Sequence, residues 1–382
     1  MRIALAFGLC LIAVAAVAGP RAKDLPKPET DVSAAAQNVR ENFRARINEN
    51  VVTIMAGSPS GTDLAIVQDI ASVLDDGDKL RVLPMVGKGP EQNIKDVLFL
   101  RGVDMGVTQA NLLKHFDKTG ELGSNLRGQI AYIAKLFNEE LHILVREDIN
   151  DIKELSGKPV NFGPEGSGAE ITGRLIFEAL GVETQKVHIN DADAIEKLKR
   201  GEIAATIAVT GKPAPALASL KDASGLKLLP VPYAEGLEDE YYPATFTHDD
   251  YPNLVPAGGR VDTMSVCAVL VSFNWSGDSV RYQKIAKFVD GFFANFDRFL
   301  VAPRHPKWRE VNFAAVLEDW RRSPLAQKWI DRAKQTSDSA SRGHFDAFLA
   351  QASGARAEPI SEEERAELFR AFLQWNKGRN QN

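Results

Sequence analysis

Two spacings of apolar residues alternate along most of the chain. Short β-branched and apolar runs, such as residues 51–56 and 159–162, predict buried strands. Apolar residues three or four positions apart, as at Ile171, Leu175 and Ile176, predict the helices that follow them. Strands that alternate with helices predict an α/β fold with a parallel sheet, whose ligands bind beyond the carboxyl ends of the strands.

A glycine turn joins the strand at 159–162 to the helix that runs to Ala179. Three glycines, Gly163, Gly166 and Gly168, surround Ser167 in this turn. The first amides of a helix have no intrahelical partner and carry the positive end of the helix dipole, so the turn suits a small anion. A tight turn without a ligand explains the glycines as well. The spacing matches neither a P-loop, nor a dinucleotide fingerprint, nor a serine-hydrolase elbow.

A second turn has the same arrangement. The strand at 51–56 leads to Ser58, Pro59, Ser60, Gly61 and Thr62, and a helix is predicted over 63–74. Two such turns that face each other would form a cleft that holds a ligand from both sides. Farther along, Gln109 follows a strand and opens a helix, so its amide could reach this cleft; the alternative is a helix cap or a surface residue.

The later segments supply core. Separate strands are predicted at 130–137 and 141–145, and a buried strand at 264–273 contains Cys267 as a small core residue. An amphipathic helix is predicted over 279–300, with helical packing continuing to Trp329. Ser361 and Glu364 form a capping box for a last helix.

The first residues indicate export. Arg2 precedes an apolar run that ends in small residues, which predicts a signal peptide over residues 1–18, cut after Ala18. An uncleaved membrane anchor is the alternative. Cys10 would leave with the signal, so Cys267 would have no disulfide partner. These features predict a periplasmic protein of ordinary globular composition, 44% hydrophobic and 25% charged over 382 residues. A net charge of −5 argues against nucleic acid as a partner.

No catalytic constellation is visible in the sequence. The six histidines are scattered without ligand spacing, and the one tight polar cluster, His248 to Asp250, is interpreted as a solvated loop. We therefore expect no metal, no cofactor and no enzyme activity.

The order of several motifs resembles a known family. VTIMAGSPSG, GVTQA, HILVRE, GPEGSGAEIT, GKPAPA and VDTMSVCAVLV occur in that order between Val51 and Leu300. This order is similar to that in the TAXI-type solute receptors of tripartite ATP-independent periplasmic (TRAP) transporters. GPEGSGAE and the turn Gly-Lys-Pro-Ala-Pro are the most specific of these motifs.

The resemblance implies a type II periplasmic-binding-protein fold with two α/β lobes, two crossover segments and a ligand between the lobes. The chain would then divide into a signal peptide (1–18), a linker or arm (19–50), lobe 1 (51–146), lobe 2 (147–262), the return to lobe 1 with its helices (263–335), and a connector with a C-terminal helix (336–382). The ligand-binding residues that it implies are Ser58, Ser60, Gly61, Thr62, Gln109, Gly166, Ser167, Gly168, Ala169, Gly211, Lys212 and Pro213. Lys212 could pair with a ligand charge or be a solvated lysine.

The turn pattern and the resemblance both predict capture of a small organic anion, a carboxylate or an amino-acid-like compound, between the lobes. The resemblance further implies that the protein delivers this anion to membrane permease subunits. One alternative keeps the fold but acts as a sensor or adaptor without transport. Another is an enzyme on the same fold.

Overall fold

The computed structural model describes residues 34–336, apart from residues 60, 78, 222, 224, 234, 235, 239 and 278, together with residues 367, 369 and 370. The chain divides into two compact units, residues 1–46 and 47–382. The segment expected as a linker or arm is helical from residue 34, in helix α1 (Ala34–Glu49). The predicted signal peptide lies outside the described residues, as does nearly all of the predicted C-terminal connector and helix. Within the described part, no helix is both long and apolar enough to cross a membrane.

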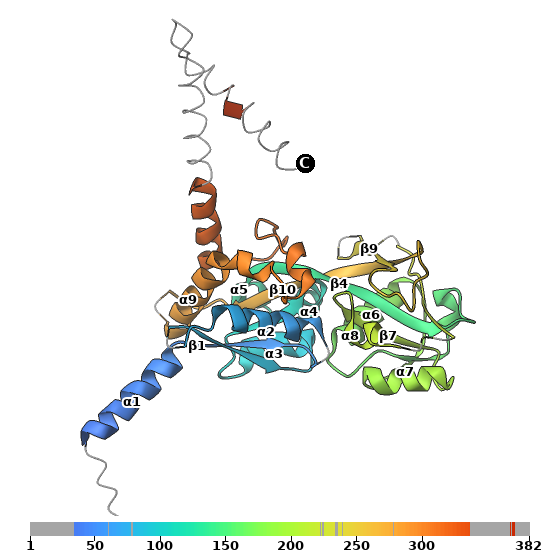
Figure 1. The fold of residues 1–382 in the computed structure, drawn as a ribbon, viewed down its shortest axis with the longest axis horizontal. Coiled ribbons are helices and arrows are strands. Elements are labelled where there is room, and N and C mark those ends of the chain that lie inside the picture. The colour runs from blue at the N-terminus through green and yellow to red at the C-terminus, as the bar shows by residue number, and fades with distance from the viewer. Residues whose placement is uncertain are drawn as a thin grey trace, which may run out of the picture. The chain divides into compact units, whose positions relative to one another are not determined.

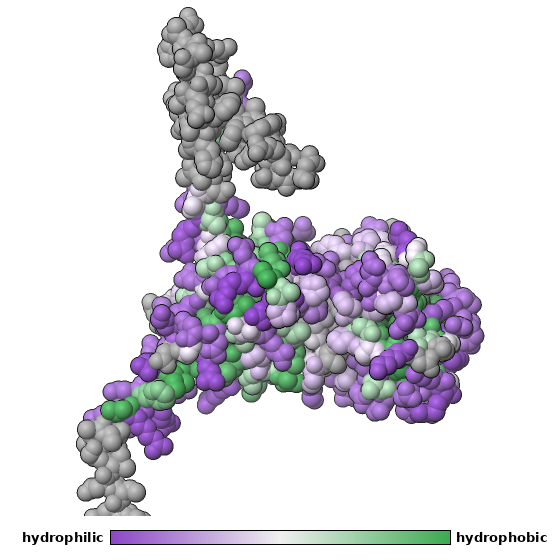
Figure 2. Space-filling view, in the orientation of Figure 1, coloured by the Kyte–Doolittle hydropathy of each residue, from purple (hydrophilic) through white to green (hydrophobic). Residues whose placement is uncertain are grey.

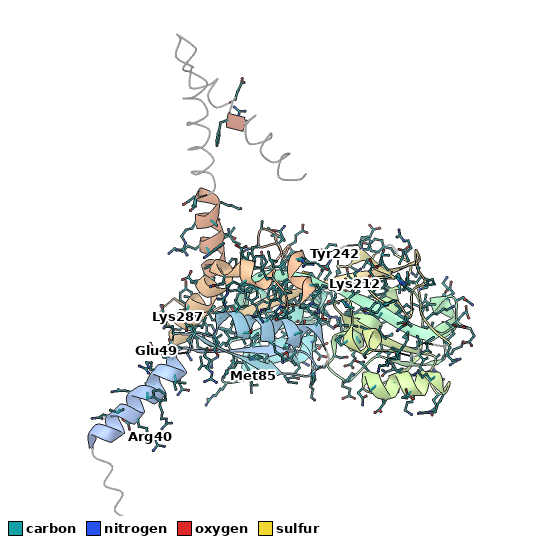
Figure 3. The ribbon with its side chains drawn as sticks, in the orientation of Figure 1. Arg40, Glu49, Met85, Lys212, Tyr242 and Lys287 are labelled. Atoms are coloured by element: carbon teal, nitrogen blue, oxygen red, sulfur yellow. The ribbon has the colours of Figure 1, made fainter. Side chains whose placement is uncertain are left out.

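Lobe 1 is built on three parallel strands, β1 (Val51–Ala56), β2 (Arg81–Val86) and β3 (Met105–Gln109). Each strand leads into a helix: α2 (Thr62–Leu74), α3 (Pro90–Phe99) and α4 (Ala110–Thr119). The strand β2 is the outer edge of the sheet and contains Pro84. Leu83, Met85 and Val86 on this strand are exposed. Figure 3 shows Met85 at the lower edge of the lobe, and Figure 2 shows apolar patches there within a mostly hydrophilic surface.

Lobe 2 also combines strands with helices, and three of its strands have only three residues each. Its strands are β5 (Pro159–Asn161), β6 (Gln185–Val187), β7 (Ala205–Thr210), β8 (Leu226–Leu228) and β9 (Tyr242–Thr247). Its helices are η1 (Ile152–Leu155), α6 (Gly168–Ala179), α7 (Asp191–Lys199) and α8 (Pro215–Ala218). The glycine turn thus precedes α6, as the sequence predicts.

Two long strands run through both lobes (Figure 1). They are β4 (Ile130–Arg146), which follows the short helix α5 (Leu126–Gln129), and β10 (Arg260–Phe273). The prediction of two separate strands at 130–137 and 141–145 is wrong. Asn138, Glu139 and Glu140 interrupt the apolar run, but each is paired in the ladder with β10 between Ser265 and Cys267, so the strand continues through them.

The order of the strands defines the fold class. It runs β2-β1-β3-β10-β4-β7-β5-β6, with β8 also on β4 and β9 also on β10. Two α/β lobes joined by two strands form the type II periplasmic-binding-protein architecture, and the predicted fold class is confirmed. The chain passes from one lobe to the other within β4, where Glu140 pairs with both Ser265 of β10 and Thr210 of β7.

An aromatic cluster closes the core of lobe 1. The long helix predicted over 279–300 is α9 (Val280–Ala294) followed by the 3₁₀ helix η2 (Phe296–Phe299), and a further 3₁₀ helix, η3 (Pro306–Glu310), precedes a helix over residues 324–336. The interpretation of the aromatic stripe as core is confirmed. Phe292 is fully buried, and its ring packs within 6.0 Å, centroid to centroid, of Phe288, Phe293, Phe299, Phe313 and Trp308. Cys267 is buried as expected, and burial raises the pKa of its thiol to about 11.

Phe292→Ala should therefore destabilise the protein by about 3–5 kcal/mol, because it leaves a cavity in the middle of this cluster. The measurement is the free energy of unfolding in urea. Phe99→Ala is the matched control, since Phe99 is 65% exposed and its truncation should change stability by no more than about 0.5 kcal/mol. Equal losses for the two variants would contradict the placement of Phe292 at the centre of the core.

Candidate functional site

A cavity of about 420 Å³ lies between the two lobes. Lobe 1 contributes the turns after β1 and β2, and lobe 2 contributes the turn after β5, the start of α7, most of β7 and the helix α8. The strand β4 adds Glu139, His142 and Leu144. The turns lie at the carboxyl ends of parallel strands, where the fold class predicts a ligand. Its volume is within the range of small-molecule sites.

Several predicted ligand-binding residues line this cavity. They are Ser58, Gly61, Thr62, Ser167, Gly168 and Ala169. The turns before α2 and α6 therefore face the same space, although they are more than a hundred residues apart in the sequence. Gly61 and Ser167 cap the two helices without a side-chain hydrogen bond to the helix amides. Ser60 lies outside the described residues.

The lobes contact each other beside the cavity. Thr62 Oγ1 of α2 donates to the carbonyl of Gly211 at 3.0 Å, and its amide donates to Thr210 Oγ1 at 3.3 Å. The turns after β2 and β5 also meet. A Cβ on Gly89 would lie 2.8 Å from the carbonyl oxygen of Gly166 and 2.9 Å from Cα of Ser167. Only a residue without a side chain fits there, so Gly89 marks a backbone contact between the lobes.

Gln109 does not line the cavity but links the two lobes behind it. Asn111 Nδ2 of α4 donates to Thr172 Oγ1 of α6 at 2.8 Å, and Thr172 in turn donates to Gln109 Oε1 at 2.6 Å. Gln109 Nε2 then donates to Glu139 Oε2 at 2.7 Å. Gln109 occupies the N-cap position of α4, which is the capping alternative that the sequence allowed, but its side chain makes no capping hydrogen bond. It is fully buried, so it is not a surface residue, and it lies outside the cavity lining. Its side chain also leaves no room for a Cβ on Gly168, which would lie 2.4 Å from Nε2.

Lys212 also lies outside the cavity lining, and so do Gly166, Gly211 and Pro213. Figure 3 shows Lys212 in the region where the lobes meet. Its Nζ donates to the carbonyl of Thr245 at 2.7 Å and to Asp250 Oδ2 at 3.0 Å. The charge of Lys212 is thus paired within lobe 2 instead of being directed at a ligand. Asp250 is correspondingly a structural partner, which corrects its interpretation as part of a solvated loop.

Sequence reasoning missed the titratable residues of the cavity. Asp63, Glu139, His142 and Asp191 all contribute to its lining, as does the exposed Lys88 at the turn after β2. Asp63 follows a helix start, where an acidic residue is ordinary, and Glu139 lies in what the sequence suggested was a break between strands. No spacing in the sequence indicated that they would meet.

His142 is held neutral inside lobe 2. Burial lowers its pKa to about 3. Its Nε2 lies 2.6 Å from the hydroxyl of Tyr251, which already accepts from the amide of Ala214, so Tyr251 donates to Nε2. The other ring nitrogen, Nδ1, then donates to the carbonyl of Glu140 at 2.9 Å. His142 therefore stiffens the wall of the cavity and carries no charge at neutral pH.

A buried ion pair anchors the crossover. Lys307 of η3 is 2% exposed, and its Nζ contacts Glu140 Oε1 at 2.6 Å and Glu310 Oε1 at 2.8 Å. The second oxygen of Glu140 accepts the amide of Lys212 at 2.8 Å. Glu140 therefore connects the return segment of lobe 1 to the turn after β7 in lobe 2.

A cleft between two α/β lobes that share two strands defines the class of solute-binding proteins. Residues 54–272, more than half of the chain, match the model of the NMT1-like family, and the chain belongs to that family.

Solved structures similar to this chain include three with low identity. A periplasmic transporter is 12% identical with a TM-score of 0.44, covering 76% of this chain and 95% of the other. A protein from Bordetella bronchiseptica RB50 is 13% identical with a TM-score of 0.44, covering 70% and 78%. A substrate binding protein of an ABC uptake transporter from Streptococcus pneumoniae, with bound histidine, is 12% identical with a TM-score of 0.41, covering 67% and 91%. Identities this low do not indicate a shared solute.

Lys307→Met should destabilise the protein by about 3–5 kcal/mol at pH 8, because it leaves the carboxylate of Glu140 buried without its counter-charge. The loss should shrink toward pH 5. Burial already raises the pKa of Glu140, and without Lys307 this carboxyl would be protonated at still higher pH, which removes the unpaired charge.

Urea unfolding at the two pH values measures this loss. Lys287→Met, which changes an exposed lysine labelled in Figure 3, is the control and should have little effect. Adding Glu140→Gln to Lys307→Met should recover part of the stability. A double variant as unstable as the single one would show that the unpaired charge is not the cause.

Proposed function

We propose that this protein is an extracytoplasmic receptor that captures a small organic solute between its lobes and delivers it to a membrane permease. The cavity between the lobes, bordered by hydrogen bonds from one lobe to the other, carries the proposal. Membership of the NMT1-like family and the solute-binding fold support it. The periplasmic location and the permease remain parts of the proposal, supported by the predicted signal peptide and by the TAXI-type order of motifs.

The turn before α6 is the proposed position for an anionic group of the solute. Ser167, Gly168 and Ala169 line the cavity there, and the cap leaves the first amides of α6 without a side-chain partner. Lys88 lies beside this turn, since its Cβ is 3.6 Å from the position that a Cβ on Gly166 would take. A carboxylate would gain the helix dipole and a nearby cation together.

Closure of the lobes is the proposed mechanism. A solute shifts the protein toward the closed state only by the difference between its affinities for the closed and the open state. Thr62, the turn at Gly89, and the link from Asn111 through Thr172 to Gln109 all make contacts that require the lobes to be together. Binding with such closure needs no bond-making step, so the proposed role is capture and transfer without catalysis.

Gly89→Ala should weaken solute binding by about tenfold or more, since the added Cβ would collide with the backbone of the other lobe only when the lobes meet. A thermal-shift screen of organic acids and amino acids first identifies a binder. Small-angle scattering then measures compaction by that binder, and calorimetry measures its Kd.

Gly102→Ala is the matched control. Gly102 also has a positive φ, 91° against 142° for Gly89, but a Cβ there would meet no atom within 4 Å. Both variants therefore introduce local backbone strain, but only Gly89→Ala introduces a collision between the lobes. If the two variants bind equally well, or if no compound compacts the protein, capture by closure at this contact is wrong.

A further inference from the structure

Two carboxyl groups in the cavity have no role in capturing an anion. Asp63 lies in the first turn of α2, and Glu139 lies on the crossover strand β4. Both line the cavity, and their exposed fractions are 4% and 3%. We refer to Asp63 and Glu139 together as the acid pair. Two buried acids facing a cavity disfavour an anion and favour a group that donates hydrogen bonds.

Asp63 has an unused acceptor at this place. Its Oδ1 is buried and makes no hydrogen bond within the described residues. Its Oδ2 lies against Gly57, 3.3 Å from the position that a Cβ there would take. A buried polar atom without a hydrogen-bond partner costs roughly 1–3 kcal/mol, and more when it is charged. Such an atom is expected where a ligand donates the missing hydrogen bond.

No side chain neutralises the acid pair by a direct ion pair within the described part of the chain. Lys307 is a buried cation, but its charge is already paired with Glu140 and Glu310. Glu139 receives one neutral hydrogen bond, from Gln109. Of the two adjacent glutamates on β4, Glu140 is therefore paired with a lysine, whereas Glu139 faces the cavity without a cationic partner.

We propose that the acid pair binds a protonated nitrogen of the solute, an ammonium or an amidinium group, with Asp63 Oδ1 accepting its N–H. This inference rests on the proposed receptor function and specifies the solute: it carries a positively charged nitrogen. A carboxylate at the turn before α6 is compatible with it, because that turn belongs to the other lobe. The solute class is then a cationic or zwitterionic amine.

The acid pair makes binding depend on pH. Burial raises the pKa of Asp63 to about 7, and burial together with the charge of Asp63 raises the pKa of Glu139 well above its usual range. The other titratable groups facing the cavity are neutral His142, half-buried Asp191 and exposed Lys88. Behind the pair, the charge of Glu140 raises the pKa of Glu139, and that of Lys307 lowers it. An amine stays protonated up to about pH 10. A cation favours the ionised acids, so its binding expels protons and weakens as the pH falls.

The test uses paired probes and measures Kd by calorimetry at pH 8 on the full mature chain. The probes are ω-amino acids from glycine to 6-aminohexanoate, the unsubstituted carboxylates of the same chain lengths, and the corresponding diamines. We expect aminated probes to bind and to compact the protein more strongly than their carboxylate counterparts. For the best amine, Kd should rise about tenfold from pH 8 to pH 6, as one group with a pKa near 7 becomes protonated.

Asp63→Asn decides the sign of the charge effect. It should weaken the best amine by roughly 30-fold or more and abolish most of the pH dependence. Removal of the same negative charge would strengthen the binding of an anion. Glu139→Gln gives the same test if Asp63→Asn does not fold, and Glu178→Gln, an exposed acid paired with Arg174 on α6, is the control that should leave Kd unchanged.

Each other outcome overturns the inference. Carboxylates that bind as tightly as their aminated counterparts would refute it while leaving the receptor function intact, because the lobes would still close. Unchanged or tighter binding in Asp63→Asn would do the same. If none of these probes binds but a neutral or purely anionic compound from the wider screen compacts the protein, the inference of a cationic solute is refuted and the receptor function is not. If no compound compacts the protein, the receptor function fails as well.

Discussion

The antiparallel pairing of β4 with β10 is the interaction on which the remaining structure depends. Because both strands extend through both lobes, their ladder joins the parallel strands of lobe 1 and lobe 2 into one continuous sheet, with a gap between the lobes that forms the cavity. The parallel strands on either side then direct their carboxyl ends, and the helices that follow them, toward that gap. The position of the cavity follows from this pairing before any side chain is considered.

The crossover carries polar residues through a buried region, and each must be satisfied there. The amide of Asn138 donates to Glu310 Oε2, Glu140 pairs with Lys307, and Glu139 accepts from Gln109. Since Glu310 and Lys307 come from the return segment of lobe 1, this segment is tied to the crossover strand β4 by charge and hydrogen bonds together. Buried charges of this kind give little net stability, but their geometry restricts how the two lobes can be arranged.

Much of the fold could be predicted from spacing alone, because period and turn chemistry are local properties. The helix starts at Thr62 and Gly168, the core stripe of α9 and the burial of Cys267 all follow from such patterns. Long-range pairing could not be predicted. A lysine in a loop gives no sign that Asp250, 38 residues later, will take its charge, and two acids 76 positions apart give no sign that they will share a cavity. The one signal that sequence reasoning overlooked was the pair of adjacent glutamates, Glu139 and Glu140, in a largely apolar run, because burying a charged side chain is costly unless it has a partner.

The edge strand β2 has a consequence for whether molecules of this chain associate through their sheets. A sheet edge has a row of unpaired hydrogen-bonding groups. Burial of the exposed apolar side chains Leu83, Met85 and Val86 would further stabilise an added strand. Pro84 stands in the middle of that row and has no amide hydrogen to give. A strand of a neighbouring molecule that paired with β2 would lack one hydrogen bond at the centre of the ladder. Pro84 therefore disfavours edge-to-edge association of these sheets.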